Sequence, residues 1–209
     1  MGALSGFVSK LWARPTPVAT RAGLADFIDS RAAFLAQKCI VEFCRVRSGV
    51  YWQKLFAEEE FQRELDKARW RSYPATLAMV AEMVEGSLRE AAGLDQRKLP
   101  AALEGVAAEI CGRYPVPEGG GETFWADARA MVHERLAATQ AGPPRPVRDM
   151  PAPMARKVFD ALPLHKDIVT NDYDYIFNNL RMNLLRAHED FLGAADLAAL
   201  ARDLVGRNP

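Results

Sequence analysis

The chain has 209 residues, 49% of them hydrophobic and 26% charged, which is typical of one globular domain or of one domain with an appended subdomain. Its 27 basic and 27 acidic residues cancel to a formal net charge of +0, so no overall positive field attracts nucleic acid and we expect no nucleic-acid partner. Three cysteines, an odd number, argue against a disulfide framework and favour apolar core residues in a reducing compartment. No apolar run approaches the ~18 residues that a membrane span needs, which predicts a cytoplasmic protein.

The first predicted helix covers residues 3–13 and ends before Pro15. Its apolar side chains recur with helical spacing at Leu4, Phe7, Val8, Leu11 and Trp12. No acidic residue precedes Asp26, so this stripe lies in a basic segment. Three interpretations stay open: a helix docked on its own core or on a partner, a helix lying on an anionic membrane surface, and a targeting segment.

The middle of the chain predicts a series of further helices. A long helix is expected over residues 21–47, ended by Gly49. Three consecutive acids at residues 58–60 favour the start of the next helix, and Pro74 is expected to break or kink it, with a new helix beginning beside the proline. The remaining predicted helices are 100–114, with Pro100 in its first turn, 123–139, capped by Thr123, then 154–162, 172–191 and 195–205.

Five prolines between residues 141 and 153 predict an extended, semi-rigid connector. We therefore divide the chain into four parts: an amphipathic helix with a proline linker (1–18), a main helical domain (19–140), the connector (141–153), and C-terminal helices that pack on the main domain (154–209). No alternating strand pattern of useful length appears, so the predicted fold is all-α, an irregular multi-helix bundle.

The helix predicted over 172–191 carries an unusual polar stripe beside its apolar face. Asparagine is a poor residue inside a helix because its side chain competes for backbone hydrogen bonds, so three asparagines together with arginines need compensating partners. They form a structural or solvated network, or they line a ligand pocket in which an arginine binds a carboxylate or phosphate. The candidate ligand-binding residues are Tyr175, Asn178, Asn179, Arg181, Asn183 and Arg186.

Catalytic and metal-binding motifs were sought without success. The chain has no HExxH, no zinc spacing of Cys and His, and no Glu three residues before His133 or His188, so we expect no metal site and no cofactor. It has no G-x-S-x-G nucleophile motif, and the glycines at 119–121 are not followed by the Lys-Ser or Lys-Thr of a phosphate loop. The aromatic and basic residues 67–74 are compatible with a contact surface or with binding of single-stranded nucleic acid, but a run of acids precedes them and a packed helix end is the favoured interpretation.

Three short strings resemble those of a group of small alphaproteobacterial all-helical proteins. The strings are residues 69–74 (RWRSYP), 113–117 (RYPVP) and 178–181 (NNLR), within a similarity that covers most of the chain. Some members of that group carry an esterase label, which implies a serine hydrolase. This chain lacks the nucleophile motif, so the resemblance does not transfer the activity. An Ala-, Arg- and Pro-rich composition is also typical of a GC-rich bacterial genome.

These observations favour a non-catalytic interaction protein: an adaptor, an assembly factor or a regulatory subunit. A protein partner is expected, through residues 3–13 or another apolar surface, and homo-oligomerisation is compatible with the sequence. The alternatives are a small-molecule or lipid-binding helical protein, or a hydrolase, whose pocket lies on the 172–191 helix, and peripheral membrane attachment through residues 3–13.

Overall fold

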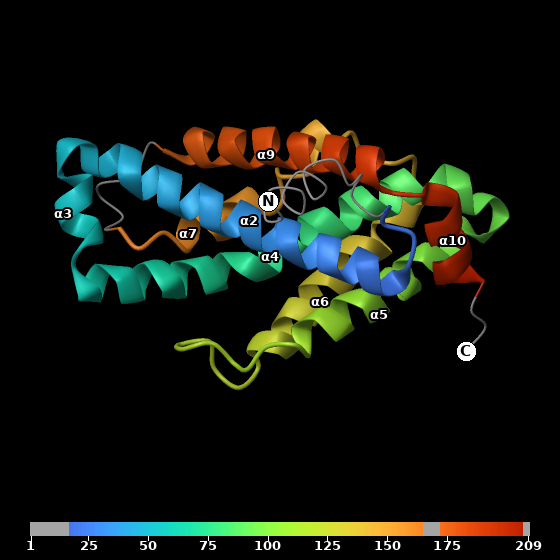
Figure 1. Cartoon of the computed structure of the whole chain (residues 1–209), viewed down its shortest axis with the longest axis horizontal. Coiled ribbons are helices and arrows are strands. Elements are labelled where there is room, and N and C mark those ends of the chain that lie inside the picture. Colours follow the sequence, from blue (N-terminus) through green and yellow to red (C-terminus); the bar gives the residue numbers. More distant parts are fainter. Residues whose placement is uncertain (1–16, 165–171, 207–209) are drawn as a thin grey trace, which may run out of the picture.

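A computed structural model describes residues 17–164 and 172–206, and in these ranges every regular element is a helix (Figure 1). The predicted all-α bundle is therefore confirmed. The α-helices are α2 (Arg21–Ser48), α3 (Trp52–Phe56), α4 (Glu59–Ala92), α5 (Leu99–Cys111), α6 (Phe124–Ala137), α7 (Ala155–Asp160), α9 (Tyr173–Ala194) and α10 (Leu197–Val205). Short 3-10 helices lie between them: η1 (Gly49–Tyr51), η2 (Gly93–Lys98), η3 (Thr139–Ala141) and η4 (Val147–Asp149).

The two longest helices, α2 and α4, form a hairpin that α3 closes at one end of the molecule (Figure 1). The Thr20 side chain caps α2 by accepting a hydrogen bond from the backbone N–H of Gly23 at 3.2 Å. Gly49, with a φ of 53°, ends the helix in a conformation that residues with a Cβ rarely adopt.

Helix α4 runs through Pro74 without a break, so the prediction that a new helix begins beside the proline is wrong. A proline inside a helix has no N–H to donate and usually destabilises it by ~3 kcal/mol or more. Here the proline is buried, and Thr76 beyond it donates its hydroxyl to the carbonyl oxygens of both Tyr73 and Ala32 at 2.9 Å. Packing against α2 on this side of the helix offsets the local cost.

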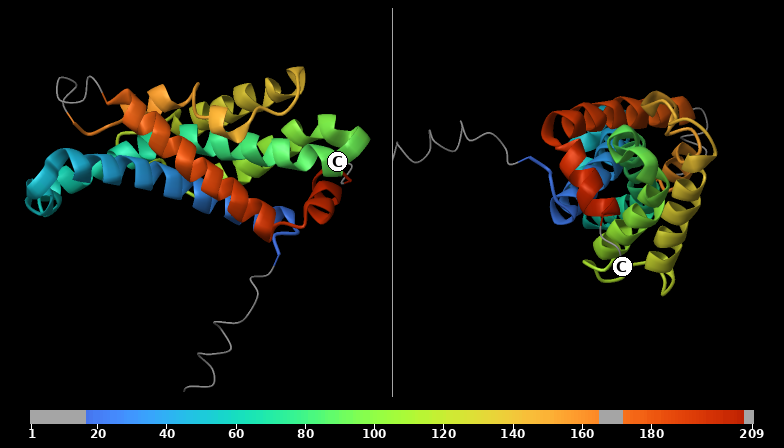
Figure 2. Two further views of the ribbon diagram at one scale, coloured as in Figure 1. Left: turned by 90° about the horizontal axis from the view of Figure 1, so that it is seen from above. Right: turned by 90° about the vertical axis from the view of Figure 1, so that its right-hand side faces the viewer.

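The other helices surround α4. Helix α6 packs against it together with α5, and α7, α9 and α10 contact it from other sides (Figure 2). One hydrophobic cluster includes buried side chains from α2 to α10, so helices before and after residues 141–153 share a core. At the start of α6 the Thr123 hydroxyl donates to the Asp127 carboxylate at 2.8 Å and makes no capping bond to the backbone, which corrects the predicted cap.

The chain entering α2 is tied to the turn between α9 and α10. The N–H of Val18 donates to the carbonyl of Ala194 at 2.8 Å, and the N–H of Asp196 donates to the carbonyl of Val18 at 3.1 Å. The N–H of Arg21 donates to the Asp203 carboxylate at 2.7 Å. These bonds connect residues almost two hundred positions apart and fix where α2 begins.

The proline-rich stretch 141–153 is partly wound rather than fully extended. It contains the end of η3 and all of η4, and its Met150 side chain is buried in the core. We call residues 142–150 the strap, because they lie across α4 and are held there by side chains of α4 and α6.

All three cysteines, Cys39, Cys44 and Cys111, are free and buried. Burial raises the pKa of Cys39 and of Cys44 to about 12 and that of Cys111 to about 11. Because the thiolate is the reactive form, we predict that none of the three reacts with Ellman's reagent at pH 8 in the native protein, and that all three react in denaturant. A thiol that reacts within minutes without denaturant would contradict this packing.

Candidate functional site

Two segments far apart in the sequence, 69–74 and 113–117, meet at a buried carboxylate on α2. The hydroxyl of Tyr73 donates to Oδ1 of Asp29 at 2.6 Å, and the hydroxyl of Tyr114 donates to Oδ2 at 2.8 Å. Arg113 Nη1 lies 3.3 Å from Oδ2 and 2.9 Å from the Asp26 carboxylate. The Asp29 charge is thus fully paired although its side chain is only 10% exposed.

This arrangement keeps both tyrosines protonated. Burial raises the pKa of Tyr73, and the hydrogen bond to Asp29 raises it further. The same two causes raise the pKa of Tyr114. Both hydroxyls therefore serve as donors to Asp29, and neither is available as a base at neutral pH.

Around this carboxylate the aromatic rings of α4, α6 and the loop after α5 form one cluster. Trp70 contacts Tyr73, Tyr114 and Trp125 with ring-centroid distances of 5.7, 5.5 and 5.9 Å, all edge to face. The indole N–H of Trp125 donates to the carbonyl of Pro115 at 3.1 Å and so fixes the loop that carries Tyr114. The cluster makes a rigid wall from three separate parts of the chain.

A pocket of about 230 Å³ opens between this wall and α2, and we call it the aromatic pocket. Its lining residues are Ala33, Ala36 and Gln37 of α2, Asp66, Arg69, Trp70 and Tyr73 of α4, and Tyr114. The small alanines of α2 leave the space that the rings face. At the rim, Arg69 donates to Asp66 at 2.7 Å and to Gln37 at 3.0 Å, which links the two helices.

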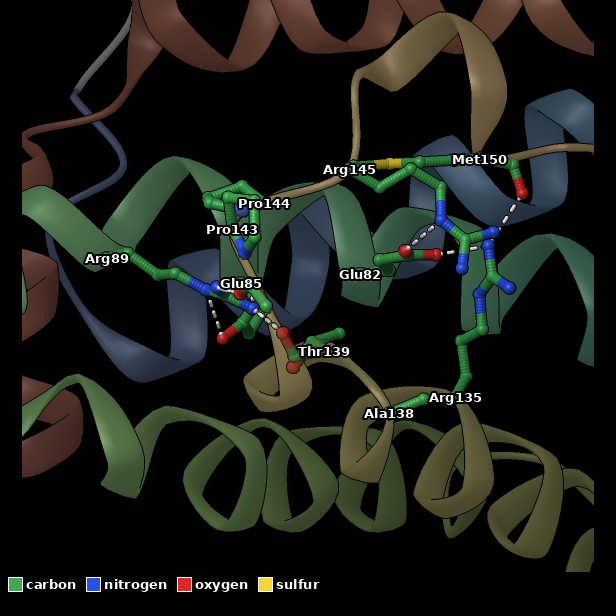
Figure 3. A pocket seen from close by; sticks show the side chains of 12 residues that line it. Glu82, Glu85, Arg89, Arg135, Ala138, Thr139, Pro143, Pro144, Arg145 and Met150 are labelled. Atoms are coloured by element: carbon green, nitrogen blue, oxygen red, sulfur yellow. Dashed lines mark hydrogen bonds and ion pairs between the residues drawn. The ribbon is translucent and has the colours of Figure 1, made fainter.

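A second, smaller cavity lies under the strap, and we call it the charged cavity (Figure 3). Its charged lining residues are Glu82, Glu85 and Arg89 of α4, Arg135 of α6 and Arg145 of the strap. Its volume is about 70 Å³. Burial raises the pKa of Glu82, an effect that the neighbouring Arg135 and Arg145 oppose.

The six residues predicted on the 172–191 helix lie on α9 but do not converge on one point. Asn183 is buried and donates to the backbone and side-chain oxygens of Asn179 at 2.8 and 3.0 Å, a contact within the helix. Arg181 lies over the ring of Phe177, 5.9 Å from its centroid. The remaining three, Tyr175, Asn178 and Arg186, are exposed, and the ring of Tyr175 lies 5.6 Å from that of Phe43.

The predicted contact residues Leu4, Phe7, Val8, Leu11 and Trp12 lie outside the described residues. Another apolar surface is present where α2 passes through η1 into α3, and we call it the apolar end. Its exposed side chains are Val46, Val50, Tyr51 and Trp52, with 55, 88, 73 and 37% of their surface accessible. Within residues 17–164 and 172–206 no helix is long and apolar enough to cross a membrane.

The aromatic pocket was not predicted from the sequence, although the sequence contains signs of its parts. The interpretation of residues 67–74 as a packed helix end is the first of these signs, and Trp70 and Tyr73 do pack against other rings. Nothing in the sequence placed Tyr114 beside them. The available signal was Asp29, an acid directly after Phe27 and Ile28 on the apolar face of the predicted helix, because a buried carboxylate requires donors from elsewhere in the fold.

No family model, no curated protein and no solved structure matches the chain. A function can therefore be inferred only from the arrangement of the chain's own residues.

The Asp29 contacts predict a measurable loss of stability. Removing the hydroxyl in Tyr114→Phe takes one donor from a buried carboxylate, and we expect the free energy of unfolding to fall by about 1–2 kcal/mol. The control Tyr51→Phe removes the hydroxyl of an exposed tyrosine and should change it by less than about 0.5 kcal/mol. Urea titration followed by circular dichroism measures both, and equal stabilities for the two variants would show that the Tyr114 hydroxyl does not support Asp29.

Proposed function

We propose that this protein is a non-catalytic helical interaction protein, an adaptor, assembly factor or regulatory subunit, that receives one apolar side chain of a protein partner in the aromatic pocket. The observation that carries the proposal is the match between the size of this pocket and the chemistry of its walls. Aromatic anchors that insert into such pockets supply most of the binding energy at many protein interfaces.

The volume favours a side chain over a larger ligand. At about 230 Å³ the pocket is smaller than the roughly 300–1,000 Å³ of most small-molecule sites. A single Leu, Phe or Trp side chain fits a space of this order. The rings of Trp70, Tyr73 and Tyr114 give it large apolar contact surfaces that are already held in place.

The rim of the pocket suits a peptide backbone. Arg69, Asp66 and Gln37 lie at the mouth and are partly exposed, so their remaining donors and acceptors face solvent. Polar groups that surround an apolar centre are the usual anatomy of a protein interface. A partner that inserts its anchor between these side chains finds hydrogen-bonding groups of both kinds around it.

The chemistry of the pocket supports a binding role rather than catalysis. The lining residues include no Ser, Cys, Thr, His or Lys, and their one carboxylate, Asp66, is paired with Arg69 at the rim. The nearest buried carboxylate, Asp29, already accepts hydrogen bonds from both tyrosines. The apolar end adds a second exposed surface of the kind that protein partners cover.

The competing proposals are a binding protein for a small molecule or lipid, and peripheral membrane attachment through residues 3–13. The aromatic pocket is of a size that also admits a phenol or an indole, so the first alternative uses the same site. The experiment must therefore distinguish a peptide ligand from a small aromatic molecule.

A displayed library of random peptides tests the proposal against the intact chain and two variants. Ala33→Phe adds a ring to the wall of the pocket, whereas the matched control Ala22→Phe adds one at an exposed position of the same helix. We expect selected peptides to share one large apolar residue. We also expect them to bind the unmodified chain and Ala22→Phe equally, and Ala33→Phe at least about tenfold more weakly, since a lost anchor costs ~1.4 kcal/mol or more.

Two outcomes would contradict the proposal. Peptides that bind Ala33→Phe as tightly as the unmodified chain would place the contact elsewhere. The second outcome is a library that yields no pocket-dependent peptide, while p-cresol or indole quenches tryptophan fluorescence saturably and Ala33→Phe abolishes this quenching. That outcome would favour the small-molecule alternative.

A further inference from the structure

One half of the charged cavity is fully hydrogen-bonded. The Nε of Arg89 donates to both oxygens of Glu85 at 2.9 and 3.0 Å, and its Nη1 donates to the carbonyl of Gly142 at 2.8 Å, with a further bond to the carbonyl of Thr139. The side-chain amide of Gln140 also donates to Glu85 at 2.6 Å. This half holds the strap and leaves no charge without a partner.

The other half is incompletely satisfied. Arg135 donates to the carbonyl of Met150 at 2.7 Å and forms an ion pair with Glu82, yet no residue in the described ranges gives its Nε a hydrogen-bond partner. Oε2 of Glu82 also accepts no well-formed hydrogen bond, although the Arg135 guanidinium lies beside it. Both side chains are only 6% exposed, so solvent does not replace the missing partners.

Arg145 completes this half from the strap. Its Nε lies 3.5 Å from Oε1 of Glu82, longer than a good hydrogen bond, and its side chain is 40% exposed. In Figure 3 the guanidinium groups of Arg145 and Arg135 lie close together beside the Glu82 carboxylate. The lining of the cavity thus holds three arginines against two glutamates, one more positive than negative charge.

We propose that the charged cavity binds inorganic phosphate in a form that keeps a proton. Its unprotonated oxygens accept hydrogen bonds from Arg135 Nε and from Arg145, and its P–OH donates to Oε2 of Glu82. One ion then gives the unpaired Arg135 Nε a partner, gives Glu82 a donor in addition to Arg135, and balances the surplus positive charge. Arginine is well suited to this role because its planar fork of donors matches oxyanion geometry.

The size of the cavity agrees with this ligand. A water molecule needs about 10–15 Å³ of such space, so about 70 Å³ admits on the order of five water-sized atoms. Phosphate has one phosphorus and four oxygens. The additional group of a phosphate ester would have to project out of the cavity past the strap, so we expect the free ion to bind in preference to an ester.

Glu82 makes the proposal selective. Phosphate at neutral pH keeps at least one proton with which to meet a carboxylate, whereas sulfate keeps none and would place an unprotonated oxygen against Glu82. The negative charges of the sulfate oxygen and of the Glu82 carboxylate, both shielded from water, would repel each other and oppose binding. The site should therefore distinguish two anions of nearly equal size and shape.

The test compares thermal unfolding of the full chain at pH 7 in phosphate, sulfate, phenyl phosphate and chloride at equal ionic strength, with calorimetric titration of phosphate for stoichiometry. We expect one phosphate per chain. At a hundredfold excess over Kd we expect phosphate to raise Tm by about 5 °C or more relative to chloride. Sulfate and phenyl phosphate should give the chloride value.

Two arginines of the same segment provide the matched variants. Arg145→Gln removes a partly exposed donor that lines the cavity, and we expect it to abolish the phosphate shift. Arg148→Gln removes an exposed arginine, 70% accessible, that does not line the cavity, and it should keep the shift. If Glu82→Gln folds, its amide can donate as well as accept, so sulfate should now stabilise the protein as phosphate does.

Four results would overturn the proposal. The first is that phosphate does not raise Tm at all, and the second is that sulfate raises it as much as phosphate, which would mean an unselective anion effect. An equal rise of Tm in phenyl phosphate would mean an open surface site, and equal loss of the Tm rise in both arginine variants would mean a general dependence on positive charge.

Discussion

The structure depends on one constraint, the burial of α4 around its whole circumference from Ser72 to Glu85. A helix in this position has no solvent face, so each polar group on it needs a partner from the protein. Ser72 and Thr76 satisfy this requirement with backbone carbonyls, at 2.8 and 2.9 Å. The larger polar groups require side chains from other helices, and these requirements determine where the neighbouring elements pack.

Both cavities follow from that constraint. Tyr73 on α4 reaches a partner in Asp29 of α2, and Asp29 in turn accepts from Tyr114, which brings the loop after α5 beside α4 and builds the aromatic wall. About three to four turns further along α4, Glu85 accepts a hydrogen bond from Gln140, and Arg89 donates to the carbonyl of Gly142 at the start of the strap. The proline-rich segment is thus fixed through its backbone oxygens, which suits a stretch that has fewer N–H donors because its prolines carry none.

The sequence predicted the helices well where the apolar period was regular, as in the segment 21–47, which forms α2. It failed at Pro74, because the rule that proline ends a helix is local, whereas the packing of Thr76 against Ala32 is not. The asparagines of α9 are unusual inside a helix and so predicted a site there, whereas the aromatic pocket combines residue types that are common in any core. Ala33 and Ala36 become informative only when the rings opposite them are known, and that pairing crosses more than thirty positions.

Native-state hydrogen exchange read by mass spectrometry tests the central position of α4 most directly. If α4 is one continuous helix enclosed on every side, the amides of residues 75–88 should exchange only through global unfolding, more slowly than those of α3 and α10 at the surface. Raising the denaturant concentration should then accelerate their exchange with the full slope of global unfolding. Exchange of the amides of residues 75–88 as fast as those of α10 would contradict the account. Local unfolding of the part of α4 that begins at Pro74, faster than unfolding of the whole protein, would also contradict it.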